Sequence, residues 1–126
     1  MRTDRLDEFN RQVLLLQDEA YSLAFCLLAD QTAASRVTQF TFEYAYAQSC
    51  KNSKSLKCFV LRTILDQCVP LSLPGGLNHR ERCILLLVDH LALSYEEAAF
   101  VLRCSPARIA RRLALARFKA ANCDRI

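Results

Sequence analysis

Arginine and lysine side chains crowd one short stretch of the sequence, and their characteristic chemistry is the binding of polyanions. Six basic residues and no acidic residue occur from Arg103 to Lys119. Guanidinium and ammonium groups bind phosphate oxygens and also reach the edges of DNA bases. The stretch therefore predicts contact with nucleic acid. The alternative is a solvated basic face on a helix of a bundle.

The charge of the chain is concentrated in its second half. The net charge is +4; residues 1–76 carry eight Lys or Arg and eight Asp or Glu, whereas residues 77–126 carry nine and five. An asymmetry of this kind favours a polyanionic partner for the second half.

Two helix-start signals frame the basic stretch. Ser94 and Glu97 form an S-x-x-E capping box, and Ser105 followed by Pro106 supplies an N-cap and a proline at the first helical position. These signals predict a short helix, a three-residue turn and a final helix that runs to about Asn122. This is the arrangement of a helix-turn-helix.

The final helix separates its apolar residues from its basic ones. At about 100° per residue, the apolar side is made by Ile109, Leu113, Ala116 and Ala120. A stripe on another side holds Arg108, Arg111, Arg112 and Lys119. A basic stripe that begins in the first turns suits a helix that enters the major groove.

The rest of the sequence also predicts helices, so the expected fold class is all-α. Only two glycines and three prolines occur in 126 residues, which favours long helices and few loops. Apolar spacing predicts helices from about Asp4, over 20–29, from Asp30 to about Gln48, over 55–68 and over 78–92. On the third of these, the residues expected to face the core are Val37, Phe40, Tyr44 and Ala47.

The segment VPLSLPGG marks the clearest boundary. It covers residues 69–76 and holds two of the three prolines and both glycines. The sequence therefore predicts two small helical domains, residues 1–68 and 77–126, joined by a short linker.

Neither a metal site nor catalytic chemistry is predicted. No two of the seven cysteines form C-x-x-C, and His79 and His90 lack metal-ligand spacing relative to them. The cysteines are expected to be reduced, mostly buried thiols of a cytoplasmic protein. No Gly-rich phosphate loop or catalytic arrangement occurs, so we expect no enzyme and no cofactor. No apolar run has membrane-spanning length, so no membrane partner is expected.

The C-terminal stretch resembles the promoter-reading domain of extracytoplasmic-function sigma factors, the smallest members of the sigma-70 family. The motifs that carry the resemblance are LNHRERCILLL (77–87), LSYEEAA (93–99) and RLALAR (112–117). The first half is similar to the other sigma domain, through AYSLAFCLLAD (20–30), VTQFTFEYAYA (37–47) and SLKCFVLRTILDQCV (55–69). The resemblance thus covers nearly the whole chain.

The resemblance implies a transcription initiation factor. Such a protein binds core RNA polymerase, captures the −10 promoter element with its region-2-like four-helix domain, and reads the −35 element with its region-4-like helix-turn-helix. The resemblance and the basic stripe together give a candidate −35 site made of Ser105, Arg108, Arg111, Arg112, Arg117 and Lys119. Of these residues, Arg112 and Arg117 match arginines of the family.

It also implies two sites in the first domain. The candidate −10 contacts are Lys51, Asn52 and Lys54 in a base-capturing loop, with Lys57, Phe59 and Arg62 on the helix that opens the strands. The candidate polymerase contacts are Gln39 and Phe42.

Departures from the family pattern keep other functions open. Ala34 and Ser35 stand at the positions where the family has an acidic pair. Leu65 and Asp66 stand at the positions where the family has arginine and asparagine. The linker between the two domains is also short. One alternative is a sigma-like interaction protein that binds an anti-sigma factor or another regulator, or modulates polymerase without initiating. A weaker alternative is a stand-alone helix-turn-helix repressor, which would need a dimer interface.

Overall fold

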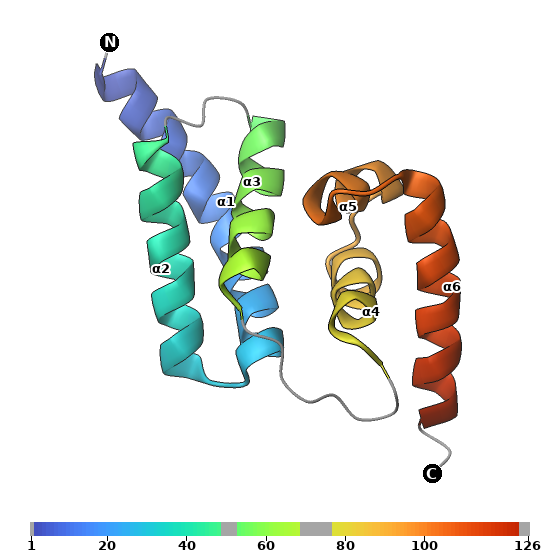
Figure 1. The fold of residues 1–126 in the computed structure, drawn as a ribbon. Coiled ribbons are helices and arrows are strands. Elements are labelled where there is room, and N and C mark those ends of the chain that lie inside the picture. Colours follow the sequence, from blue (N-terminus) through green and yellow to red (C-terminus); the bar gives the residue numbers. More distant parts are fainter. Residues whose placement is uncertain (1, 49–52, 69–76, 124–126) are drawn as a thin grey trace. The chain divides into compact units, whose positions relative to one another are not determined.

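The computed structural model describes residues 2–48, 53–68 and 77–123, and every element in these segments is a helix (Figure 1). The prediction of an all-α fold is confirmed. Within the described part of the chain, no helix has the length and apolar composition needed to cross a membrane.

Two compact units make up the chain, Met1–Val69 and Pro70–Ile126. The expected linker, residues 69–76, lies outside the described residues. The first unit packs three helices against one another: α1 (Arg2–Leu28), α2 (Gln31–Ala47) and α3 (Ser53–Gln67).

Helix α1 is continuous where the sequence predicted two helices. The polar run Gln17–Glu19 carries no glycine or proline and consists of residues that helices accommodate, so nothing interrupts the backbone there. The second part of α1 forms the centre of the first unit, as expected, through the buried residues Ala20, Leu23, Ala24 and Leu27. The helix ends at Leu28, and the next residue, Ala29, has a left-handed φ of 54°. Asp30 then caps α2 by accepting hydrogen bonds from two backbone amides.

Helix α2 buries a different face from the predicted one. Phe40 and Tyr44, expected in the core, are 52% and 41% exposed, and the buried residues are Ala34, Thr41 and Ala45. Small side chains let α2 approach its neighbours closely, which the larger aromatic rings would prevent. The Thr41 hydroxyl is satisfied there, since it donates to the Val37 carbonyl (2.7 Å) and accepts from Gln67 Nε2 (2.8 Å).

The second unit contains a short helix, a π-helix and the two helices of the predicted helix-turn-helix. Their bounds are α4 (His79–Ile84), η2 (Leu85–His90), α5 (Tyr95–Leu102) and α6 (Pro106–Cys123). The helix predicted over 78–92 is present as α4 followed directly by η2, where the backbone widens to π-type bonds from Leu85. Asp89 lies within this π-helix.

The predicted capping box at Ser94 and Glu97 is confirmed, and α4 begins with a second capping box at Asn78 and Glu81. The side chains of Asn78 and Ser94 accept from the backbone amides of Glu81 and Glu97, and each glutamate accepts in return from the amide of its cap residue. The predicted apolar side of α6 is confirmed by its buried residues Ile109, Leu113 and Ala116, while Ala120 is half-buried.

Three of the described cysteine side chains are buried: Cys58, Cys68 and Cys83. Cys26 and Cys104 are partly accessible, and the side chains of Cys50 and Cys123 lie outside the described residues. Burial raises the pKa of the Cys68 thiol to about 11, so this sulfur stays protonated and unreactive near neutral pH.

Candidate nucleic-acid interface

The turn between α5 and α6 has a well-defined backbone geometry. The amide of Cys104 donates to the Ala99 carbonyl (3.0 Å) and that of Arg103 to the Phe100 carbonyl (3.4 Å), which is the Schellman pattern. Arg103 occupies the left-handed position (φ 58°), where glycine is usual. The cost of placing arginine there is about 1 kcal/mol. The turn thus adds a cation close to the start of α6.

Ser105 is the N-cap of α6, as the sequence predicted. Its Oγ accepts from the backbone amide of Arg108 (3.2 Å), and Pro106 is the first helical residue. The first amides of the helix, together with the helix dipole, make this end attractive to phosphate.

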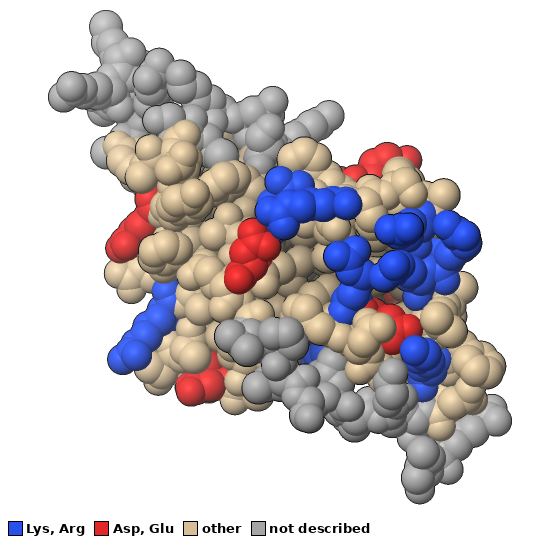
Figure 2. Space-filling view, in the orientation of Figure 1, with Lys and Arg blue, Asp and Glu red and all other residues tan. Residues whose placement is uncertain are grey.

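Three of the predicted −35 residues are exposed at this end of the helix. Ser105, Arg108 and Arg111 are exposed, and Arg112 is half-buried. Figure 2 shows Lys and Arg side chains gathered over the N-terminal part of α6. These first turns can present guanidinium groups and backbone amides together to a phosphate backbone.

Lys119 is held inside the unit. Its ammonium lies 2.9 Å from Oε2 and 3.1 Å from Oε1 of Glu81, whose side chain is 4% exposed. The pKa of Glu81 is lowered mainly by the hydrogen bond from the Asn78 backbone amide, then by Lys119 and by the charge of Arg112, against the opposing effect of burial. The same carboxylate therefore caps α4 and fixes the second half of α6.

Arg117 is also bound within the unit. Its Nε and Nη2 donate to the two carboxylate oxygens of Asp89 at 3.1 and 2.5 Å. This forked contact holds the pKa of Asp89 below its ordinary value, chiefly through the hydrogen bonds from Arg117. The structure thus separates the six predicted −35 residues into four in the first turns of α6, three of them exposed, and two cations that bind α4 and η2.

The predicted −10 residues lie partly on α3. Lys57, Phe59 and Arg62 are half-buried on this helix, whereas Lys51, Asn52 and the side chain of Lys54 lie outside the described residues. The three described side chains do not form one row, since Lys57 lies on a different side of the helix from Phe59 at 100° per residue.

Phe59 belongs to a row of stacked rings that sequence reasoning missed. Its ring lies 5.7 Å from that of Tyr44, which lies 6.0 Å from that of Phe40. Interplanar angles of 20° and 7° make the row a stack that spans α2 and α3. We call Phe40, Tyr44 and Phe59 the aromatic row. The available signal was the four-residue spacing of Arg36, Phe40 and Tyr44, which puts a cation and two rings on one exposed stripe.

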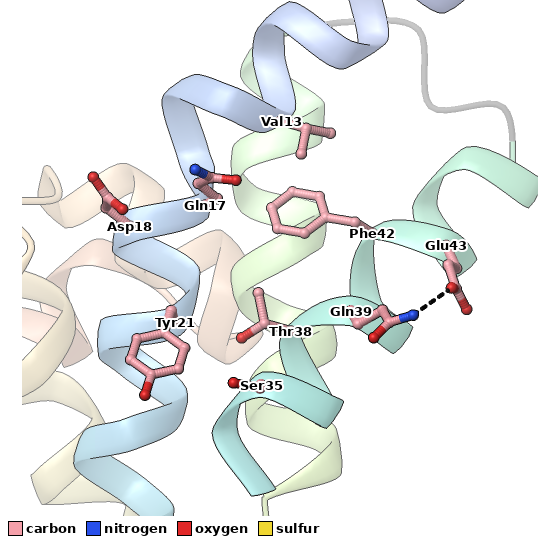
Figure 3. A pocket seen from close by; sticks show the side chains of 9 residues that line it. All are labelled: Val13, Gln17, Asp18, Tyr21, Ser35, Thr38, Gln39, Phe42 and Glu43. Atoms are coloured by element: carbon pink, nitrogen blue, oxygen red, sulfur yellow. Dashed lines mark hydrogen bonds between the residues drawn. The ribbon is translucent and has the colours of Figure 1, made fainter. Parts of the chain in front are cut away.

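Gln39 and Phe42, the predicted polymerase contacts, lie together in a groove between α1 and α2 (Figure 3). The groove has a volume of about 530 Å³, and the Phe42 ring projects toward Val13 of α1. Gln39 Nε2 donates to Glu43 Oε1 (3.1 Å) at the rim. The residues that line the groove are Val13, Gln17, Asp18, Tyr21, Ser35, Thr38, Gln39, Phe42 and Glu43.

The lining of this groove is acidic and apolar. It holds two carboxylates, Asp18 and Glu43, and no lysine or arginine, next to the rings of Tyr21 and Phe42. Such a lining fits a partner segment that presents a cation beside an apolar side chain. No protein-family model, curated protein or solved structure matches this chain.

Proposed function

We propose that the protein is a minimal sigma-type transcription initiation factor. The observation that carries this proposal is the capped helix-turn-helix whose last helix exposes Arg108 and Arg111 in its first turns. The motifs of the sequence that resemble sigma factors include this same helix pair. Duplex DNA would meet the start of α6, where helix amides and guanidinium groups converge.

The groove between α1 and α2 supports the polymerase-binding part of the proposal. Its position brings together Gln39 and Phe42, which were assigned to the polymerase from the resemblance alone. Asp18 and Glu43 line the groove, so acidic charge is present although Ala34 and Ser35 replace the acidic pair of the family. A basic helix of core RNA polymerase is the partner that this lining would accept.

The aromatic row supports contact with an opened strand. Stacked rings on a protein surface bind unpaired bases in a way that tolerates any sequence, at about 1–3 kcal/mol per base. Tyr44 is 41% exposed and Phe40 is 52% exposed, so both rings offer accessible area. We therefore propose that residues of α2 and α3 together bind the opened DNA strand.

Run-off transcription with core RNA polymerase and this protein tests the proposal. Promoter fragments should give discrete transcripts that core polymerase alone does not make. Tyr44→Ala should reduce strand opening, read by permanganate footprinting, by roughly 10-fold because one stacking contact is lost. Leu14→Ala, which truncates an exposed α1 residue outside both sites, should leave opening unchanged. Absence of any protein-dependent transcript would refute the proposal.

Two observations favour a second function, a sigma-like protein that binds a regulator or polymerase without initiating. Arg117, one of the two arginines that match the family, is bound to Asp89. Asp66 is exposed on α3, where a carboxylate repels a phosphate backbone. This second function predicts polymerase or regulator binding without transcripts, so the same assay distinguishes it from initiation.

A further inference from the structure

Two cations of α6 form ion pairs with the rest of their unit, and the two pairs differ in their exposure to solvent. The side chain of Lys119 is 33% exposed and that of its partner Glu81 is 4% exposed, and the same carboxylate caps α4. The side chain of Arg117 is 53% exposed and that of its partner Asp89 is 39% exposed. The first pair is therefore part of the packed unit, whereas the second lies at the surface, where other ions can reach both groups.

The contact between Arg117 and Asp89 has a geometry in which a guanidinium also binds phosphate. Nε and Nη2 of Arg117 donate to the two carboxylate oxygens of Asp89. An arginine makes the same pair of parallel hydrogen bonds to a carboxylate and to a phosphate group. The carboxylate of Asp89 thus occupies the donors that a DNA phosphate would use.

The ion pair can open without loss of the fold. An ion pair at this exposure changes an equilibrium constant by roughly 2- to 5-fold, because water and salt screen both charges. The unit is held together by buried apolar residues, among them Leu87 of η2 with Ile109 and Leu113 of α6. A phosphate that binds Arg117 therefore has only a weak internal competitor to displace.

Arg117 lies further along the helix whose first turns carry the candidate DNA contacts. It follows Arg111 by six residues, which is about 9 Å along the helix axis. At 100° per residue, Arg117 lies beside the buried residues of α6, on the flank away from Arg112. A helix in the major groove has a phosphate backbone along each flank. A duplex that Arg111 contacts would therefore bring phosphates toward Arg117.

We infer that Asp89 competes with DNA phosphates for Arg117 and thereby sets the affinity of the protein for duplex DNA. In the free protein Asp89 holds the guanidinium, and in the complex a phosphate takes the place of the carboxylate. DNA that contacts only the first turns of α6 does not displace Asp89, so the exchange favours a duplex that follows more of the helix. The inference rests on the proposed function, because it requires duplex DNA at the start of α6.

Fluorescence anisotropy of the full chain with a fluorescein-labelled duplex of mixed sequence, in about 0.1 M salt, tests the inference. Asp89→Asn keeps the shape of the side chain and removes its charge, so it should raise the affinity roughly 3-fold. Asp89→Ala also removes the acceptor and should give a similar increase. Asp7→Asn is the matched control, since it removes the same charge from an exposed position on α1 and should change the affinity by less than about 1.5-fold.

A double-mutant cycle separates this exchange from a general effect of charge. In a protein that already carries Arg117→Gln, Asp89→Asn should raise the affinity by less than about 1.5-fold, because the guanidinium that Asp89 holds is then absent. An equal increase with and without Arg117 would mean that Asp89 repels DNA directly, and this result would overturn the inference. Circular dichroism checks that each variant is folded.

The same titrations distinguish failure of the inference from failure of the proposed function. If Arg108 and Arg111 are needed for duplex binding but neither Asp89 variant binds more tightly than the wild type, the inference alone is wrong. If neither the wild type nor the Asp89 variants bind the duplex, the inference and the DNA-binding part of the proposed function are both wrong.

Discussion

Replacing Arg108 and Arg111 by glutamate should remove at least ~99% of the affinity of the full chain for promoter duplex at low salt. Both side chains are exposed in the first turns of α6, next to the helix amides that follow Ser105. Each lost phosphate contact reduces the magnitude of the slope of log affinity against log salt concentration by about 1. In the double variant the magnitude of this slope should therefore be smaller by about 2. Fluorescence anisotropy at several salt concentrations measures both quantities.

The matched control changes the net charge by the same amount elsewhere. Arg36 on α2 and Arg80 on α4 are both exposed, and their double replacement by glutamate gives the same total charge. This control should keep most of the affinity and nearly all of the salt slope. Equal losses in the two double variants would mean that the chain binds DNA through its net charge and not through the start of α6.

Replacing Glu81 by alanine should lower the free energy of unfolding by about 3 kcal/mol. The substitution removes the acceptor that completes the capping box of α4 and leaves Lys119 without its buried partner. Urea unfolding followed by circular dichroism measures the change. Glu96→Ala, which removes an exposed carboxylate in the first turn of α5, should change the same quantity by less than about 0.5 kcal/mol.

The contribution of Glu81 should also depend on pH in a defined direction. Its pKa is lowered from the ordinary value of 4.5 in the folded protein, mainly by the hydrogen bond from the Asn78 amide. The stabilisation is therefore fully present above pH 4.5 and is lost as the pH falls through the lower, folded-state pKa. Glu81→Gln should flatten the decline in stability below pH 4.5. An unchanged acid profile in this variant would contradict the role assigned to the carboxylate.

Local signals predicted the elements around the candidate DNA interface well. Caps act within three or four residues, so Ser94 and Ser105 could be assigned from the sequence, and the structure has both where expected. The apolar side of α6 followed from its periodicity, because Ile109 and Leu113 are large residues on a helix with one buried face.

Interactions between distant residues could not be predicted in the same way. Asp89 and Arg117 are 28 positions apart, and Glu81 and Lys119 are 38 positions apart, so no local pattern pairs them. Asp89 also lies in the π-helix η2, which has no marker in the apolar spacing. Two cations assigned to DNA from the sequence, Arg117 and Lys119, form ion pairs with Asp89 of η2 and Glu81 of α4 in the structure.

The wrong prediction of the buried face of α2 has a different cause. Phe40 and Tyr44 are large aromatic residues four positions apart, so periodicity assigned both to the core. The structure instead buries Ala34, Thr41 and Ala45, and the exposed rings form the aromatic row with Phe59. Apolar spacing in a sequence indicates which face of a helix is apolar. Three helices can pack closely only where the residues between them are small.

Equilibrium binding of the fluorescently labelled protein to bacterial core RNA polymerase without DNA would show directly whether the protein is a sigma-type factor. We expect saturable binding with a dissociation constant below about 1 µM, competed by an authentic sigma factor. Phe42→Lys, which places a cation in the acidic groove, should weaken binding at least ~10-fold, whereas Leu15→Lys on exposed α1 surface should not. If binding is absent, is not displaced by an authentic sigma factor, or is unchanged by Phe42→Lys, the protein does not bind the polymerase as a sigma factor through this groove.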